Sequence, residues 1–485
     1  MSDTTHRMGD RPNRREPFNE MKGSLVEESV LFVSVLKWVV LATGIGIIVG
    51  LSTTVFLKIL NWSIAFSTRY SYYFLLMPLA LFISVVLTKY LAPDAKGHGT
   101  EKVIEAVHKR SGKIKAAVVP VKLVATIITI ASGGSVGKEG PCAQIGAGLS
   151  SIVADLLRFA DSDRKKLVIC GISAGFASVF GTPIAGAIFG VEVLFVGSLL
   201  YDVLLPSFVA GIVSYYISSS LGITYFYHAL NCMPAVKEIF FVQVVIAGIF
   251  FGLCSAFLVG ALKAGGKAAE SVKVWAPLKG IIGGFILVGL TFAFSKDYLG
   301  LGLGTIQSTL NGESIHWYSF IVKSIFTSIS LAFGGSGGII TPIFFVGSSS
   351  GNLFAQIFGL DIATFSAIGL VSVLAGAANT PIAACILAIE LFGASIAPYA
   401  AISCVISFLI TGHRSVYPSQ ILGLKKSASM DVELGKEVVN VRALFKRREK
   451  SLIGTVMTIA ERLKKRRDDK TNQNNSSHTN GEKKD

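Results

Sequence analysis

The sequence repeats one glycine-rich element, as GGSVGKEGP at residues 133–141 and as GGSGGIITP at residues 334–342. A second pair follows at a similar offset, with TPIA at residues 182–185 and again at 380–383. A glutamate stands nine residues after the proline of each TPIA copy, as Glu192 and Glu390. In membrane transport proteins, internal repeats with segments interrupted by glycine and proline mark two halves that meet at a binding site near the bilayer midplane. The chain is therefore predicted to contain a tandem membrane repeat.

The composition also indicates a membrane protein. Of the 485 residues, 51% are hydrophobic and only 15% are charged, which excludes an ordinary soluble domain. Many of the apolar runs are shorter than the ~20 residues of a full membrane span. Broken helices leave unpaired backbone groups, which hydrocarbon tolerates only where they are buried in protein or line an aqueous cavity. We predict an all-α polytopic membrane protein. The apolar runs occupy residues 31–62, 72–91, 118–131, 167–200, 241–262, 280–294, 321–333 and 363–410.

Four prolines in the repeated elements predict helix starts inside the membrane domain. They are Pro141, Pro183, Pro342 and Pro381, and a threonine precedes the last three. Proline is favoured in the first helical turn, and threonine is a good N-cap. A helix start offers free N–H groups and a partial positive charge, so it favours an anion even without a cationic side chain. Matched helix starts therefore indicate an anion site.

The charges divide the chain into three predicted parts. Residues 1–28 form a polar N-terminal tail without a cleavable signal, and residues 29–424 form the membrane domain, with halves of about 29–230 and 235–424. Residues 425–485 form a basic tail with sixteen basic and nine acidic residues, and we expect disorder from about residue 470. The positive-inside rule predicts a cytoplasmic C-terminal tail. The N-terminal tail is also expected in the cytoplasm, and the protein in the cell (inner) membrane.

Three motifs resemble the CLC family of chloride channels and chloride/proton antiporters. GKEGP at 137–141 is similar to its G(K/R)EGP motif, GIITP at 338–342 resembles its GxFxP motif, and Tyr417 falls in a tyrosine-bearing segment near the start of its final helix. The resemblance covers about residues 95–424. It implies two inverted halves of short, tilted, broken helices, and a homodimer with an anion pathway in each subunit. It resembles a prokaryotic type, since the cytoplasmic nucleotide-binding (CBS) domains common in the family are expected to be absent.

By this resemblance, Glu139 matches the gating glutamate, whose carboxylate competes with the anion and can carry a proton. An ionisable residue within a membrane segment is functional by default, although Glu139 could instead only cap its helix. Tyr417 matches the tyrosine whose hydroxyl coordinates the central anion, and its alternative is an interfacial belt tyrosine. Pro418, directly after it, suggests another helix start. The anion-binding residues that the resemblance implies are His98, Gly99, Gly137, Lys138, Gly140, Ile339, Ile340 and Tyr417.

Two departures from the family pattern concern the anion ligands. Residues 97–101 read GHGTE where the family has GSGIP, so His98 replaces a serine hydroxyl. A neutral imidazole N–H can donate to an anion, and a protonated imidazole attracts it while adding pH sensitivity. Alternatively His98 turns away, and the backbone N–H groups of Gly99 and Thr100 serve. Ile340 replaces the phenylalanine of GxFxP, which leaves a backbone N–H but alters hydrophobic gating.

A third departure concerns proton coupling. Family exchangers usually carry an internal glutamate one position after the residue matching Glu192, and here that position is Val193. Its absence favours a passive chloride channel over a proton-coupled antiporter. Glu192 is expected to be a hydrogen-bonded helix residue with Glu390 as its counterpart, yet Glu192 and His98 remain candidates for a substitute proton relay. Nitrate, bromide or fluoride rank behind chloride as the transported anion.

Other functional classes fit less well. Gly335-Ser336-Gly337 with His413 or His98 suggests a serine protease superficially, but Ser135 occupies the matching place in the other repeat. No HExxH motif occurs, and the six cysteines lack CxxC spacing. A cation transporter would place acidic residues along its path. We therefore expect no enzyme activity, no cofactor, no metal and no nucleic acid. The expected partners are chloride ions, a second copy of the chain and the lipid bilayer, with protons as a further candidate.

Overall fold

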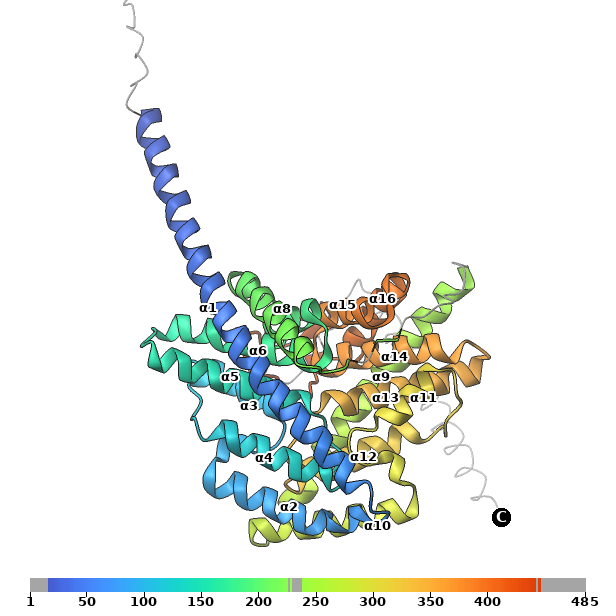
Figure 1. Ribbon diagram of the computed structural model, residues 1–485. Coiled ribbons are helices and arrows are strands. Elements are labelled where there is room, and N and C mark those ends of the chain that lie inside the picture. Colours follow the sequence, from blue (N-terminus) through green and yellow to red (C-terminus); the bar gives the residue numbers. More distant parts are fainter. Residues whose placement is uncertain (1–15, 226, 229–237, 442–443, 446–485) are drawn as a thin grey trace, which may run out of the picture.

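The computed structural model describes residues 16–225, 227–228, 238–441 and 444–445, and in these ranges it contains sixteen α-helices (Figure 1). The helical class predicted from the sequence is confirmed. The first eight helices are α1 (Glu16–Ser67), α2 (Met77–Val86), α3 (Gly99–Lys109), α4 (Val118–Ala131), α5 (Glu139–Leu156), α6 (Asp161–Phe180), α7 (Pro183–Glu192) and α8 (Leu204–Ser220). The next eight are α9 (Glu238–Ser271), α10 (Ala276–Ala293), α11 (Leu303–Leu310), α12 (Ser319–Ala332), α13 (Ile340–Phe358), α14 (Ile362–Ala378), α15 (Pro381–Phe392) and α16 (Ala397–Ile410).

Short elements connect these helices. Two small sheets are present, in which β1 (Phe195–Val196) pairs in parallel with β2 (Ile421–Leu422), and β3 (Met430–Asp431) pairs antiparallel with β4 (Leu444–Phe445). The remaining elements are short helical turns: η1 (Tyr73–Leu76), η2 (Leu87–Leu91), η3 (Pro93–Ala95), η4 (Tyr201–Val203), η5 (Lys296–Tyr298), η6 (Ala394–Ile396) and η7 (Val438–Asn440).

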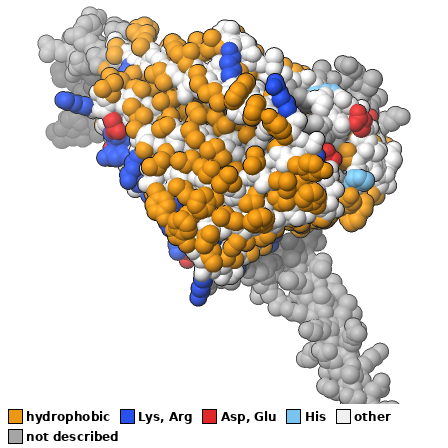
Figure 2. Space-filling view, turned by 60° about the horizontal axis from the view of Figure 1, so that its bottom comes forward, with side chains coloured by type: hydrophobic (Ala, Val, Ile, Leu, Met, Phe, Trp, Pro, Cys, Tyr) orange, Lys and Arg blue, Asp and Glu red, His pale blue; other side chains and the backbone are white. Residues whose placement is uncertain are grey.

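Five of the described helical segments are long and apolar enough to cross a membrane, namely 27–67, 73–91, 201–220, 239–271 and 276–293. The other apolar helices are shorter, as the interrupted sequence pattern predicts. Leu76 and Leu79 of the α2 region and Phe285 and Phe292 of α10 are exposed. Figure 2 shows a face on which hydrophobic side chains cover much of the surface. Such a continuous apolar surface is far larger than the patches of soluble monomers.

The two repeats contact each other through corresponding residues, since Gly137 and Gly338 form an antiparallel bridge. The Gly137 N–H donates to the Gly338 carbonyl at 2.7 Å, and the Gly338 N–H donates to the Gly137 carbonyl at 2.6 Å. The same exchange recurs upstream, where Ser135 N donates to Ser330 Oγ at 3.0 Å and Ser336 N donates to Thr129 Oγ1 at 3.2 Å. The Gly137 and Gly338 bonds join residues 201 positions apart, and the same 201-residue offset converts one upstream bond into the other, from Ser135 to Ser336 and from Thr129 to Ser330. These reciprocal bonds demonstrate the symmetry of the repeat.

Glycine allows this close meeting of the repeats. A Cβ atom at Gly338 would lie 2.7 Å from the amide nitrogen of Gly140, which is closer than real Cβ contacts come. Gly133 and Gly334 precede the paired segments with φ angles of 102° and 109°, a region that L side chains rarely adopt. The glycines thus bring the starts of α5 and α13 together.

Two glutamates join the repeats at the other matched pair of helix starts. The carboxylate of Glu390 accepts from Ile184 N at 3.0 Å and Ala185 N at 2.8 Å, at the start of α7. Glu192 accepts in the same way from Ile382 N at 3.0 Å and Ala383 N at 2.8 Å, at the start of α15. Each repeat therefore supplies the anionic cap of a helix in the other repeat. The expectation that Glu192 is a hydrogen-bonded structural residue agrees with this geometry.

The predicted helix starts are partly corrected. α7 and α15 begin at Pro183 and Pro381 as expected, but α5 begins two residues before Pro141 and α13 two residues before Pro342. The expected threonine caps are wrong as well. The hydroxyls of Thr182 and Thr380 make no capping bond, since the two glutamates already take the free N–H groups, and Thr341 lies inside α13.

Substituting alanine for Glu390 should destabilise the fold. It would leave the Ile184 and Ala185 N–H groups without their carboxylate, and hydrogen bonds to charged groups contribute about 1.5–3 kcal/mol. We expect a lower midpoint of thermal unfolding for the purified protein in detergent, with Glu390→Gln intermediate because its carbonyl can still accept. The matched control is Glu270→Gln on the exposed end of α9, which should leave the midpoint unchanged. Equal midpoints for Glu390→Ala and the control would contradict the capping role.

Candidate anion site

The backbone segments at the starts of α3, α5 and α13 meet where the two repeats join. His98, the residue before α3, forms a parallel bridge with Gly337. Gly99 and Gly140 bring the starts of α3 and α5 into contact, and Gly338 contacts Gly140 from the other repeat. The helix starts of α3, α5 and α13 therefore converge, so their free N–H groups and partial positive charges act on one region. Short apolar helices broken at glycine produce such convergence.

Glu139 lies at the centre of this region. Its side chain is 1% exposed, although it is the first residue of α5. The hydroxyl of Thr341 donates to Glu139 Oε1, and the backbone N–H of Thr341 donates to Oε2 at 3.2 Å. The carboxylate thus occupies the start of α13, a helix of the opposite repeat. A carboxylate held there takes the place that a free anion would take.

The other expected anion ligands lie near Glu139, but they differ in burial and in whether their N–H groups are free to bind an anion. Ile339 and Ile340 are buried at the start of α13, and Lys138 is partly exposed next to Glu139. Gly140 follows Glu139 in the first turn of α5. The Gly137 N–H, however, donates to Gly338, so it is not free to bind an anion in this conformation.

His98 and Tyr417 lie on one side of this region, with ring centroids 5.7 Å apart. The His98 ring therefore faces Tyr417, and its Nδ1 atom is buried without a hydrogen-bond partner among the described residues. Tyr417 is 0% exposed, and its hydroxyl likewise lacks a partner in the described part of the chain. Full burial is inconsistent with a belt tyrosine at the membrane interface. Buried groups without partners favour a bound ion or water.

The helix start suggested by Pro418 is wrong. Residues 418–419 form a turn, and β2 follows at Ile421–Leu422. Local hydrogen bonds hold the backbone of this turn. Tyr417 N donates to Ser415 Oγ at 2.9 Å, and Ser415 Oγ donates to Gln420 Oε1 at 2.6 Å.

Gln420 is a residue that the sequence analysis missed. It is 0% exposed, and its amide donates to the carbonyls of Val193 and Ala378, each at 2.8 Å. It therefore joins the Tyr417 segment to the ends of α7 and α14. No local pattern in the sequence indicates such a contact. Val193 is fully buried and offers its backbone carbonyl to this contact, while its apolar side chain cannot take a proton.

Two buried lysines were also missed. Lys122 Nζ donates to the carbonyls of Gly97 and Ala95, next to His98. Lys323 Nζ donates to the carbonyls of Tyr298 and Gly300, at 3.0 and 2.9 Å. The lysines are 201 residues apart, the same offset as the glycine-rich strings, and this spacing could have revealed them. Through these bonds Lys122 stabilises the loop before α3.

The described residues show no serine–histidine pair of the kind that a serine protease needs. Ser336 Oγ contacts Thr126 Oγ1 at 3.4 Å, and Ser135 Oγ contacts Thr327 Oγ1 at 3.0 Å, in equivalent places of the two repeats. His413 Nε2 instead accepts from the backbone N–H of Lys426 at 3.2 Å. Both serines therefore serve packing between the repeats. Among the described residues, no group of histidine, cysteine and acidic side chains could hold a metal.

A cavity of about 1010 Å³ lies apart from this site. It is lined by residues of the α1 end and of segment 296–319, including Asn61, Lys296 and His316. None of the expected site residues lines it. The candidate site is instead a closed region in this conformation, because the carboxylate of Glu139 fills the start of α13.

Comparisons with known proteins agree with this geometry. The family model described as voltage gated chloride channel matches residues 79–412. A chloride/fluoride channel protein of Pseudomonas syringae pv. tomato is 34% identical over 407 residues, covering 82% of this chain and 90% of that protein. A voltage-gated ClC-type chloride channel of Escherichia coli is 28% identical over 336 residues, covering 66% of this chain and 79% of that protein.

A solved structure extends the similarity to three dimensions. The crystal structure of a CLC-type fluoride/proton antiporter aligns with a TM-score of 0.76 and 28% identity, covering 81% of this chain and 99% of that chain. The predicted polytopic membrane fold is thereby confirmed. The chain is an integral membrane protein and belongs to the CLC family of voltage gated chloride channels and related anion transporters.

Proposed function

We propose that the protein carries small halide anions, chloride or fluoride, passively across the membrane through a pathway gated by Glu139, and that it is not an enzyme. One observation carries the proposal: the Glu139 carboxylate lies on the start of α13, bonded to Thr341 of the opposite repeat. An anion must displace this carboxylate to occupy the same N–H groups. Protonation removes the negative charge of Glu139 and with it the attraction to the helix start.

We propose fluoride as well as chloride as the transported anion because two similar proteins are named for fluoride. The protein of Pseudomonas syringae is named a chloride/fluoride channel protein, and the aligned structure is that of a fluoride/proton antiporter. Fluoride is small and strongly hydrated, so a site must replace its water with strong donors. The Thr341 hydroxyl and the helix-start N–H groups provide donors of this kind.

Proton-coupled antiport is the second candidate, and the similarity to the fluoride/proton antiporter favours it. The arrangement around α7 supports passive transport instead. Both oxygens of Glu192 are bonded to backbone N–H groups of α15, and the next residue, Val193, is apolar. A proton on Glu192 would leave the α15 start without its anionic cap. Glu192 is therefore a poor relay.

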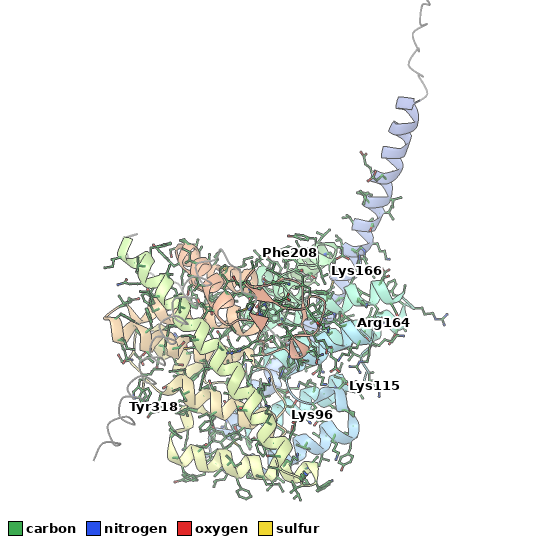
Figure 3. All side chains as sticks on the ribbon, turned by 180° about the vertical axis from the view of Figure 1, so that it is seen from behind. Lys96, Lys115, Arg164, Lys166, Phe208 and Tyr318 are labelled. Carbon is green, nitrogen blue, oxygen red and sulfur yellow. The ribbon has the colours of Figure 1, made fainter. Side chains whose placement is uncertain are left out.

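We further propose a homodimer and a cytoplasmic C-terminal side, in a cell (inner) membrane. The loops between α3 and α6 carry Lys113, Lys115 and Arg158, α6 carries Lys165, and Figure 3 shows Lys96, Lys115, Arg164 and Lys166 along one edge of the first half. Lys109 forms an ion pair with Glu437 at 2.9 Å, so the C-terminal segment lies next to α3, on this basic side. The positive-inside rule then assigns the side to the cytoplasm. The basic tail beyond residue 445 lies outside the described residues.

Glu139→Gln should abolish most of the pH dependence of anion flux. Acid protonates Glu139 in the parent protein and releases it from α13, so its flux should rise as the pH falls. The glutamine variant is neutral at every pH and should conduct at a nearly constant high rate. The measurement is chloride and fluoride efflux from liposomes between about pH 5 and pH 8. The control is Glu105→Gln, whose side chain pairs with Lys102 at 2.8 Å. Parent-like pH dependence in Glu139→Gln would refute the gate.

Thr341→Val should raise the flux at neutral pH. Valine has the shape of threonine but cannot donate to Glu139, and a hydrogen bond to a charged group contributes about 1.5–3 kcal/mol. The carboxylate should then leave the start of α13 at least about tenfold more often. The anion flux of Thr341→Val is measured in the same liposome efflux assay. Thr291→Val in α10 is the matched control, because its buried hydroxyl donates to Leu287 O at 2.7 Å away from the site. Slower flux in Thr341→Val than in the control would argue against the Glu139–Thr341 latch.

The reversal potential separates the two candidate mechanisms. With a fixed chloride or fluoride gradient, a passive pathway should give the Nernst potential of the anion at every transmembrane pH difference. Coupled exchange should shift the potential when a pH gradient is added. We expect no shift, and a reproducible shift would refute passive transport in favour of antiport. Repeating the measurement with Glu192→Gln and His98→Ala would identify a relay.

A further inference from the structure

Glu101 has a hydrogen-bonding environment that differs from that of the capping glutamates. It lies in the first turn of α3, three residues after His98, and its side chain is partly buried. Glu101 Oε1 accepts from Ser419 N at 3.0 Å and from Ser419 Oγ at 2.5 Å. Glu101 Oε2 is buried and has no hydrogen-bond partner within the described ranges. Oε1 therefore has two hydrogen bonds, whereas Oε2 has none within the described ranges.

This carboxylate connects the two elements that carry His98 and Tyr417. Its own helix begins next to His98, and Ser419 is two residues after Tyr417. Three further buried atoms near these elements lack partners in the described structure: His98 Nδ1, Tyr417 Oη and Gln144 Oε1. Gln144 lies next to Gly99, since a Cβ there would come within 2.8 Å of Gln144 Oε1. Buried polar atoms that gather without protein partners are satisfied by water or by a bound proton.

The cations near Glu101 bond to other carboxylates. Lys102 bonds to Glu105 at 2.8 Å, and Lys109 bonds to Glu437 at 2.9 Å. Glu101 forms no ion pair among the described residues, so Ser419 supplies its direct hydrogen bonds while Lys102 acts on it only through space. The charged or titratable groups on the surrounding elements are His98 before α3, Lys102, Glu105, His108 and Lys109 of α3, Asp94 of η3 paired with Arg110, Lys122 of α4, Glu139 of α5, Lys165 of α6, and Tyr417 and Glu437 of the C-terminal segment.

α3 is not one of the membrane-spanning helices. Removal of the carboxylate from water raises the pKa of Glu101 to about 7, although the two Ser419 bonds oppose the change. Both protonation states are therefore accessible near neutral pH. Lys102 and Glu105 are each about one-third exposed and lie on the same helix, so solvent reaches this end of the molecule.

We propose that Glu101 is a second proton-binding residue of the anion pathway, and that it takes up protons from the side of the C-terminal segment. A proton from solvent forms an O–H bond at the free Oε2, while Oε1 keeps its bonds to Ser419. The carboxylate becomes neutral, and the repulsion between it and an anion near His98 and Tyr417 disappears. Release of the proton to the same solvent restores the charge. This inference rests on the proposed anion transport for its effect on flux, but proton binding itself does not require transport.

Infrared spectroscopy tests proton binding on the purified full-length protein in detergent. A protonated carboxyl group has a C=O stretch that a carboxylate lacks. Titration between about pH 5 and pH 9 should show such a band that disappears with a midpoint near 7. Glu101→Gln should lose this component, and Glu105→Gln should keep it. An unchanged band in Glu101→Gln would overturn the proposal. This readout is independent of whether the protein conducts anions.

Flux measured with different pH values on the two sides of oriented liposomes tests the effect on the pathway. Acidifying the C-terminal side should raise the flux in the parent but not in Glu101→Gln, and the same proton binding should account for the small pH dependence that remains in Glu139→Gln. If Glu101→Gln does not fold, the infrared titration is repeated with Ser419→Ala. This variant loses a donor to the charged form of Glu101, so the midpoint of the carboxyl band should move to higher pH. An unchanged midpoint in Ser419→Ala would refute the proposal. A parent protein without flux but with the infrared band would refute the proposed function alone.

Discussion

The unpaired N–H groups of four helices that begin inside the protein are the constraint on which the structure depends. Hydrocarbon offers these groups no partner, so the chain must supply one. Glu390 and Glu192 supply it for α7 and α15, each from the opposite repeat. Glu139 and Thr341 meet at the start of α13. The same requirement thus joins the two repeats and creates a place where an anion competes with a side chain.

The two repeats are symmetric in their structural contacts but differ at the residues of the candidate anion site. Backbone pairing, the serine contacts, the buried lysines and the two capping glutamates all follow the two-fold relation. Glu139, however, corresponds by the 201-residue offset to Ile340, and Thr341 corresponds to Gly140. One half therefore supplies the acid and the other half supplies its donor. A symmetric pair of carboxylates at one site would repel each other, which would raise the pKa of one of them.

The sequence predicted the repeat, the interrupted helices and most of the residues near the site, because glycine and proline strings act on the local backbone. It did not predict which group satisfies each helix start. The threonines before Pro183 and Pro381 looked like caps, yet carboxylates about 200 residues away take that role. The support of Tyr417 by Gln420, and the contact of Ser419 with Glu101, 318 residues apart, also depend on tertiary packing. Local patterns contain no information about such partners.

The hydrogen bonds on each carboxylate distinguish structural acids from acids that can change state. Glu192 and Glu390 have both oxygens bonded to fixed backbone N–H groups at 2.8–3.0 Å, and protonation would weaken two bonds at once. Glu139 depends on one hydroxyl, which can rotate toward an anion, and on a longer amide contact of 3.2 Å. Glu101 has one oxygen without a partner in the described part of the chain. Protonation therefore disturbs fewer fixed bonds at Glu139 and Glu101 than at the two capping glutamates.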